Sequence, residues 1–201
     1  MKVQSLRSRI KEVTANAILD AAEQVAAEEG LSASLGAVAE RAGVAVGTIY
    51  NYFRDRDELF RELFARRRAE IFTAVDLEMK RVARASFREQ LSAFVGALLA
   101  QFDERRVFLR IALEADHCRP SMAPDEAARA WHAMRQVQKV AARVIRIGQR
   151  EGVLRPCEGD IYPAILTGIL RGILVARIDD PRPFAADAER VVSLFLHGAS
   201  T

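Results

Sequence analysis

The first 119 residues contain no proline, and this absence constrains the fold more than any other feature of the sequence. Proline kinks or ends a helix, so a long proline-free stretch is compatible with continuous helical segments. The same stretch is rich in Ala, Leu, Arg and Glu, which favour helices, and it has no alternating run of β-branched residues. We therefore predict an all-α fold.

Composition excludes several broad classes of protein. The chain has 201 residues, of which 50% are hydrophobic and 28% charged, so it is long and apolar enough to form a core without disulfides. Its two cysteines, Cys118 and Cys157, form no CxxC pair, which argues against a disulfide framework or a zinc site. We expect a globular protein of a reducing compartment, not a disordered or fibrous chain.

Two segments bear on localisation. The first residues lack the charged, apolar and small-residue layout of a signal peptide. The most apolar run, residues 161–178, has the length of a membrane span, but it contains Pro163, Arg171 and Arg177. An arginine at the centre of a bilayer is costly, so we expect a buried or interface helix here and a cytoplasmic protein without a membrane partner.

Periodicity and capping residues predict about nine helices. The first follows an apolar stripe from Ala15 to Ala26 and ends before Gly30, and the second begins after the N-cap Ser34 and ends before Gly43. Two short helices joined at a glycine turn indicate a helix-turn-helix. The predicted helices cover residues 12–29, 34–42, 46–53, 55–84, 86–102, 105–115, 125–151, 161–178 and 184–197.

The segment of residues 43–53 carries the chemistry. With helical spacing, Ile49 and Phe53 face inward, and the other faces carry hydroxyl, amide and aromatic side chains. Hydroxyl groups reach phosphate oxygens and Asn pairs with adenine, so this surface suits duplex DNA. The alternative interpretation is that Tyr50 and Tyr52 pack on the first and fourth helices.

Here the sequence resembles the TetR family of transcriptional regulators. The matching residues are Ile18 to Ala22, Gly30, Val38-Ala39, Ala42 to Val44, Gly47 to Tyr50, Tyr52-Phe53 and Asp57 to Leu59. The resemblance implies that the second motif helix enters the major groove and that Arg56 stands at the family's phosphate-binding Lys position. The DNA-contacting set that we predict, with the N-cap residue of the first motif helix included, is Ser34, Val46, Gly47, Thr48, Tyr50, Asn51, Tyr52 and Arg56.

Two positions depart from the family pattern. Ala45 stands where the family often has Ser, which removes a side-chain N-cap from the second motif helix, and Gly36 replaces a residue that often reaches DNA. The basic residues of the N-terminus, Lys2 to Lys11, form a basic arm without a carboxylate. We assign residues 1–58 to a DNA-binding domain with this arm, and residues 59–201 to a larger helical domain for effector binding and dimerisation.

The larger domain offers aromatic and cationic material for an effector pocket. Apolar side chains with a few polar groups among them are typical of small-molecule sites. For each residue taken singly, ordinary core packing is the better explanation, and it is the resemblance to the TetR family that favours a pocket for the whole set. We expect a small, mostly apolar effector, with a polar or anionic end held by Arg110, Arg135 or His117. The predicted lining is Phe94, Phe102, Phe108, Arg110, His117, Trp131 and Arg135.

The sequence contains no HExxH, Walker A or GxGxxG motif and its three histidines are scattered, so we expect no enzyme, no cofactor and no metal site. The predicted function is sequence-specific repression of transcription by a homodimer, built on the last two long helices and released by a small molecule. The alternative is a small-molecule-binding or protein-interaction module whose helix-turn-helix does not read DNA.

Overall fold

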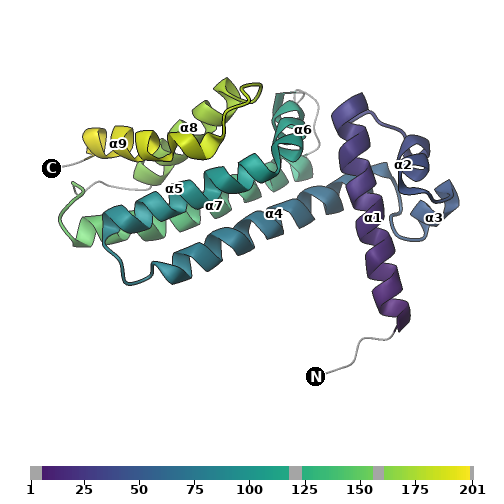
Figure 1. Ribbon diagram of the computed structural model, residues 1–201, viewed down its shortest axis with the longest axis horizontal. Helices are drawn as coiled ribbons and strands as arrows, with labels where there is room; N and C mark the ends of the chain where they lie inside the picture. The colour runs from purple at the N-terminus through teal and green to yellow at the C-terminus, as the bar shows by residue number, and fades with distance from the viewer. Residues whose placement is uncertain (1–5, 118–123, 156–160, 200–201) are drawn as a thin grey trace. The chain divides into compact units, whose positions relative to one another are not determined.

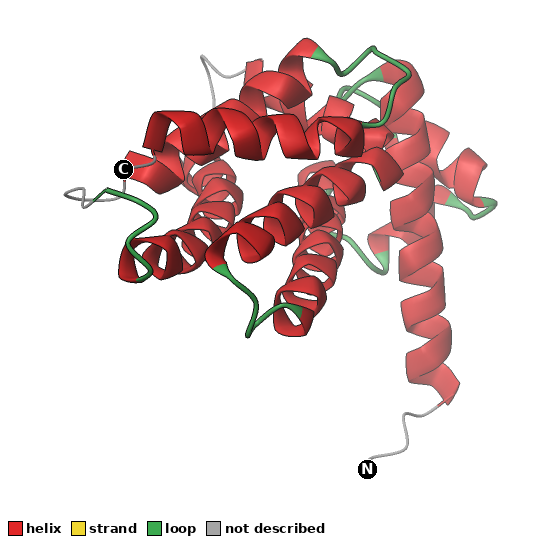
Figure 2. Ribbon diagram, turned by 60° about the vertical axis from the view of Figure 1, so that its left-hand side comes forward, coloured by secondary structure: helices red, strands yellow, loops and turns green. Residues whose placement is uncertain are grey.

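The computed structural model describes residues 6–117, 124–155 and 161–199. In these ranges the regular structure consists of nine α-helices and one short 3₁₀-helix, with no strand, which confirms the predicted all-α class (Figures 1 and 2). No helix in the described part is long and apolar enough to cross a membrane. In chain order the elements are α1 (Leu6–Glu29), α2 (Leu35–Ala42), α3 (Val46–Tyr50), α4 (Arg56–Arg81), α5 (Phe87–Glu104), α6 (Arg106–His117), α7 (Pro124–Arg150), α8 (Ile161–Ala176), η1 (Phe184–Asp187) and α9 (Ala188–Ala199).

The chain divides into two compact units. The N-terminal unit comprises Met1–Ala69 and Val107–His117, and the C-terminal unit comprises Glu70–Arg106 and Cys118–Thr201. The N-terminal unit therefore includes most of α6, although almost forty residues of the chain separate α6 from Ala69. The domain boundary predicted after residue 58 falls inside α4 and stays a prediction.

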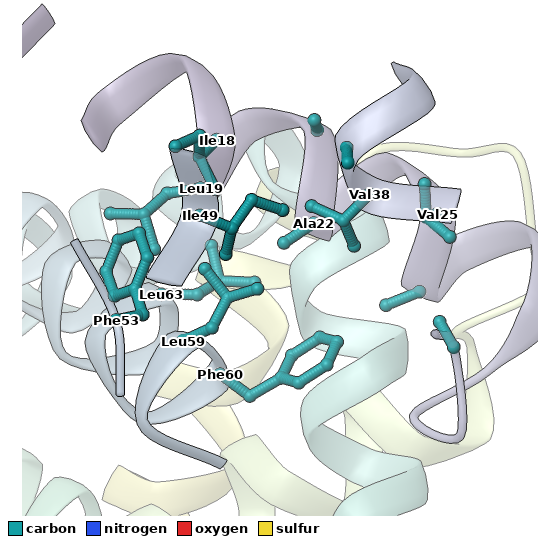
Figure 3. Packing of buried hydrophobic residues seen from close by; sticks show 14 of the residues in the cluster. Ile18, Leu19, Ala22, Val25, Val38, Ile49, Phe53, Leu59, Phe60 and Leu63 are labelled. Carbon is teal, nitrogen blue, oxygen red and sulfur yellow. The ribbon is translucent and has the colours of Figure 1, made fainter. Parts of the chain in front are cut away.

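The N-terminal unit is built around one apolar cluster (Figure 3). α1 contributes Ile18 and Ala22, which are fully buried, and α3 contributes Ile49, also fully buried. Leu59 and Leu63 of α4 point into the same cluster, as Figure 3 shows. Burial of one such aliphatic side chain stabilises a fold by about 1.5–3 kcal/mol. The cluster therefore holds α1, α2 and α3 against the first part of α4.

The C-terminal unit is centred on α5. α5 begins with a capping box, in which the Ser86 hydroxyl accepts a hydrogen bond from Glu89 N and the Glu89 carboxylate accepts one from Ser86 N. α5 packs against α7, α9 and η1, and α8 packs against α7 and α9. The side chains of Phe87, Phe94 and Phe184 are fully buried there.

Several helix boundaries differ from the prediction. α1 begins at Leu6, so residues 6–11 of the predicted arm are helical, because they contain good helix formers and neither Pro nor Gly. α3 ends at Tyr50 because Asn51 to Phe53 turn back on it, with Tyr52 N and Phe53 N both donating to Ile49 O. The last predicted helix is split into η1 and α9.

Candidate nucleic-acid interface

A serine caps the start of α2, and a glycine sets the turn between α2 and α3. Ser34 is the N-cap of α2, and its hydroxyl accepts from Ala37 N at 3.1 Å. Gly43 follows α2 with a φ of 67°, a left-handed conformation that favours glycine, and Val44 N donates to Ala39 O at 3.0 Å. Val44 then packs on the apolar cluster. These local contacts hold α2 and α3 in the predicted helix-turn-helix.

α3 presents a mixed polar and apolar outer surface. Ile49 is fully buried and fixes the inner face of the helix. On the outer side Tyr50 is 56% exposed and Val46 is 41% exposed. Asn51 is exposed and Thr48 is half-buried. The structure therefore places hydroxyl, amide and methyl groups together on one short accessible helix.

The two tyrosines of the motif have different surroundings. Tyr52 is half-buried, packs against the apolar cluster and lies with its ring centroid 6.5 Å from that of Phe53. Tyr50 is mostly exposed. The packing alternative from the sequence thus describes Tyr52 better than Tyr50. A Cβ added at Gly47 would meet nothing within 4 Å, so this glycine leaves the helix surface open to close approach from outside.

Arg56 is held by the protein itself. Its Nη1 donates to the carbonyl oxygen of Leu31 at 2.7 Å, and its Nη2 lies 3.5 Å from a carboxylate oxygen of Asp57. Leu31 lies in the loop between α1 and α2. The contact ties the first turn of α4 to this loop, and the side chain keeps 42% of its surface exposed. The phosphate contact expected of Arg56 stays a prediction.

A charged network between α1 and α4 was missed by sequence reasoning. Arg67 Nε donates to Glu23 at 2.7 Å and its Nη2 pairs with Asp20 at 3.0 Å. Arg66 donates to the side chain of Asn16 at 3.0 Å and also pairs with Asp20. Glu23 is only 9% exposed, whereas the Asp20 side chain is 53% exposed, so the network extends from the surface to one buried carboxylate. The sequence contains one signal for this network, the two acidic residues Asp20 and Glu23, which are three positions apart and so share a face of α1. Their partners, Arg66 and Arg67, lie more than forty positions away.

The N-terminal part of α1 carries the cations of the predicted arm. Arg9 and Lys11 are exposed on this helix, whereas residues 1–5 lie outside the described residues. Leu6, Ile10 and Val13 are exposed on the same segment, with 67%, 55% and 68% of their surface accessible. Arg9 and Lys11 therefore lie on the exposed first turns of α1, ahead of Ile18, the first buried residue of the apolar cluster.

The predicted effector residues are distributed over both units. Phe94 is fully buried and Phe102 half-buried on α5, in the C-terminal unit. Phe108 is buried in the N-terminal unit, with its ring centroid 5.4 Å from that of Phe64, and Arg110 is exposed there. The side chains of His117, Trp131 and Arg135 lie outside the described residues. The predicted pocket therefore stays a prediction.

Two open hollows on the C-terminal unit flank Arg88 and Ser92 of α5. One, of about 600 Å³, is bordered by α9, and the other, of about 540 Å³, by the end of α4. Neither is lined by a described member of the predicted effector set. Among the described residues, no group of three His, Cys, Asp or Glu side chains is placed to hold a metal ion.

Comparison with known proteins agrees with this geometry. Residues 18–63 match the family model described as bacterial regulatory proteins, tetR family. The fatty acid metabolism regulator protein of Bacillus subtilis is 34% identical over 79 residues, an alignment that covers 39% of the present chain and 40% of that relative.

Solved structures match over nearly the whole chain. The regulator FadR from Bacillus subtilis in complex with stearoyl-CoA superposes with a TM-score of 0.77 at 17% identity, covering 91% of this chain and 98% of the other. The fatty acid degradation regulator FadR from Bacillus halodurans gives a TM-score of 0.79 at 20% identity, covering 98% of both chains. At these identities the likeness establishes the fold. The match over residues 18–63 shows that this segment, which contains the helix-turn-helix, is similar to the corresponding part of the tetR family of bacterial regulatory proteins.

Proposed function

We propose that the protein is a sequence-specific DNA-binding repressor of transcription, acting in the cytoplasm and released by a small molecule. The observation that carries this proposal is the outer surface of α3, where Val46, Tyr50 and the C-cap residue Asn51 are exposed and Ile49 fixes the helix from within. A helix of this kind fits the major groove, which displays base edges that distinguish all four base pairs.

Each member of the predicted DNA-contacting set has a distinct role. Asn51 is suited to bidentate pairing with adenine, Val46 to contact with a thymine methyl group, and the hydroxyls of Thr48 and Tyr50 to phosphate or base-edge oxygens. Gly47 allows close approach. Tyr52 and Arg56 support the motif through the contacts described above, and Ser34 caps α2 beside it.

A homodimer supplies the two copies of α3 that a pseudo-palindromic operator needs, about 34 Å apart on B-DNA. The dimer surface that we propose is formed by α8, on which Ile161 and Ile165 remain 50% and 46% exposed, and by α9, on which Leu194 is 58% exposed. Gly168 and Gly172 leave this surface open to another helix, since a Cβ at either would meet nothing within 4 Å. Sedimentation at micromolar concentration should give a dimer, and a species of 22.3 kDa would contradict the assignment.

We propose that the effector is a mostly apolar molecule of the long-chain acyl class. The support comes from the relative that regulates fatty acid metabolism and from the similar structure that holds stearoyl-CoA. The predicted lining residues stay those given from the sequence, with Phe94 and Phe108 as the buried aromatic members that the structure describes. Release requires that the ligand binds one conformation of the regulator better than the other.

The DNA-binding proposal is tested on duplexes selected from a random library by the full-length protein. In a fluorescence anisotropy titration, Thr48→Ala and Tyr50→Ala should weaken binding to the selected duplex and leave weak binding to unrelated duplex little changed. Leu77→Ala, at an exposed position of α4 outside the motif, is the matched control. Equal affinity of all four proteins for the selected duplex would favour the alternative, a module whose helix-turn-helix does not read DNA.

A further inference from the structure

Arg54 lies in the short link between α3 and α4, three positions after Asn51, the exposed C-cap residue of α3. The backbone is held on both sides of Arg54. Phe53, just before it, is buried in the apolar cluster, and the Arg54 N–H donates to a Glu58 carboxylate oxygen at 2.6 Å. Consecutive Cα atoms are about 3.8 Å apart, so the Cα atoms of Arg54 and Asn51 are separated by at most about 11 Å. Arg54 therefore has a fixed place close to the exposed end of α3.

The side chain of Arg54 extends into solvent. It is 75% exposed, and its Nε donates to a carboxylate oxygen of Asp55 at 3.3 Å. Among the described residues, its two Nη groups have no hydrogen-bond or ion-pair partner. An exposed ion pair such as that with Asp55 contributes only about 0–1 kcal/mol, so it does not tie the guanidinium down. Both Nη groups of Arg54 are available to a ligand that approaches from outside.

Arg56, two positions later, is engaged by the protein itself. Its Nη1 donates to the Leu31 carbonyl oxygen at 2.7 Å, and its Nη2 lies 3.5 Å from a carboxylate oxygen of Asp57. The Arg56 side chain is 42% exposed, against 75% for Arg54. If Nη1 of Arg56 turned to an outside anion, the contact between α4 and the loop before α2 would be lost. Of the two arginines that follow α3, Arg54 is the one with a free guanidinium fork.

The charges around the start of α4 give this fork a purpose. Asp55 and Asp57 are 50% and 69% exposed, and carboxylates repel the phosphates of DNA. A duplex that contacts α3 therefore needs a cation at this edge of the motif. The major groove is about 12 Å wide, so a cation within about 11 Å of a base-reading residue reaches the phosphates that line the groove. An arginine fork matches phosphate oxygens with two parallel hydrogen bonds.

We propose that Arg54 binds a backbone phosphate at the edge of the groove read by α3, and that Arg56 instead holds the start of α4 to the loop between α1 and α2. The inference rests on the DNA-binding function proposed above. It adds a residue that is absent from the DNA-contacting set predicted from the sequence. Because phosphate contacts carry no sequence information, Arg54 contributes affinity and register, and α3 contributes specificity.

The test is the salt dependence of duplex binding by the full-length protein, followed by fluorescence anisotropy from about 50 to about 200 mM NaCl. The probes are the selected duplex and an unrelated duplex of the same length. Arg54→Gln should lower the slope of log K against log salt by about one unit and weaken binding to both duplexes by the same factor, because one phosphate contact is lost. Arg54→Lys should keep the slope, because it keeps the charge. Arg88→Gln, at an exposed position of α5 in the C-terminal unit, is the matched control and should bind like wild type.

Thermal unfolding separates the roles of the two arginines. Arg56→Gln should lower the melting temperature, because the bond to the Leu31 carbonyl is lost, and should keep the salt slope of wild type. Arg54→Gln should leave the melting temperature unchanged, because its one ion pair is exposed. A purely structural role of Arg54 would show the reverse, a lower melting temperature with an unchanged salt slope, and would overturn the inference.

Two further outcomes would contradict the inference. An unchanged slope in Arg54→Gln overturns it, and so does a reduction in Arg56→Gln as large as that in Arg54→Gln. In both cases wild type still prefers the selected duplex, so the DNA-binding proposal stands while the assignment of Arg54 fails. A wild type that binds neither duplex refutes the DNA-binding proposal, and the inference falls with it.

Discussion

The missing cap of α3 allows a sharp test of how the recognition helix is held. The N-cap residue of α2, Ser34, has φ −80° and ψ 152°, and the N-cap residue of α3, Ala45, has φ −72° and ψ 148°. The backbone at Ala45 is thus already in the conformation of a capping serine, but no side chain caps the helix. Ala45→Ser should therefore add a cap without moving the chain.

The expected gain in stability depends on which backbone N–H groups at the start of α3 still lack an acceptor. Removal of a side-chain N-cap costs about 1 kcal/mol, so Ser34→Ala should lower the stability of the N-terminal unit by about that amount. Thr48 N already donates to the Ala45 carbonyl at 2.8 Å, so a new hydroxyl must share this donor or take that of Gly47. We therefore expect a smaller gain for Ala45→Ser, about 0.5–1 kcal/mol.

The assay is urea and thermal unfolding followed by far-UV circular dichroism. For a chain of this size 1 kcal/mol corresponds to about 2–4 °C in melting temperature. Ala45→Thr should stabilise in the same direction, whereas Ala45→Val, of similar shape but without the hydroxyl, should not. If Ala45→Val stabilises as much as Ala45→Thr, or if Ser34→Ala is neutral, the capping argument is wrong.

Two further predictions concern the C-terminal unit. A Cβ at Gly148 would lie 2.8 Å from ring atoms of the fully buried Phe87, so Gly148→Ala should destabilise by about 1–3 kcal/mol in urea unfolding, whereas Gly96→Ala, with nothing within 4 Å, should not destabilise through such a clash. Burial raises the pKa of Asp103, but hydrogen bonds from Ala185 N, Phe184 N and Arg106 outweigh burial and lower it overall. A lowered carboxylate pKa stabilises the fold above its unfolded value of about 3.9 and loses this effect as the pH falls below that value. Unfolding measured from pH 6 down to pH 2 should therefore show a smaller acid-induced loss of stability in Asp103→Asn than in wild type, and parallel curves would refute the role of Asp103.

The local parts of the fold could be predicted from the sequence because their causes are local. Ser34 and Gly43 bracket α2 as expected, and the capping box at Ser86 and Glu89 starts α5 as expected. The inward positions of Ile49 and Phe53 followed from helical spacing alone. These features depend on residues within a few positions of one another, where sequence patterns are most informative.

The remaining features depend on contacts between distant residues. The pairing of Arg67 with Glu23 joins residues 44 positions apart, and the bond from Arg56 to the Leu31 carbonyl joins residues 25 positions apart. The predicted effector-binding residues were chosen by composition. Composition identifies aromatic residues but does not show which of them line the same pocket.

The most direct test of the central claim is the base-preference profile of the selected operator, measured for wild type and for Asn51→Ala. If α3 reads the sequence, wild type should select two symmetry-related half-sites, and the variant should lose discrimination at one base position in each half-site while it keeps the others. This follows because a single bidentate contact specifies one base pair. An identical profile for both proteins, or no selected sequence for wild type, would contradict the account.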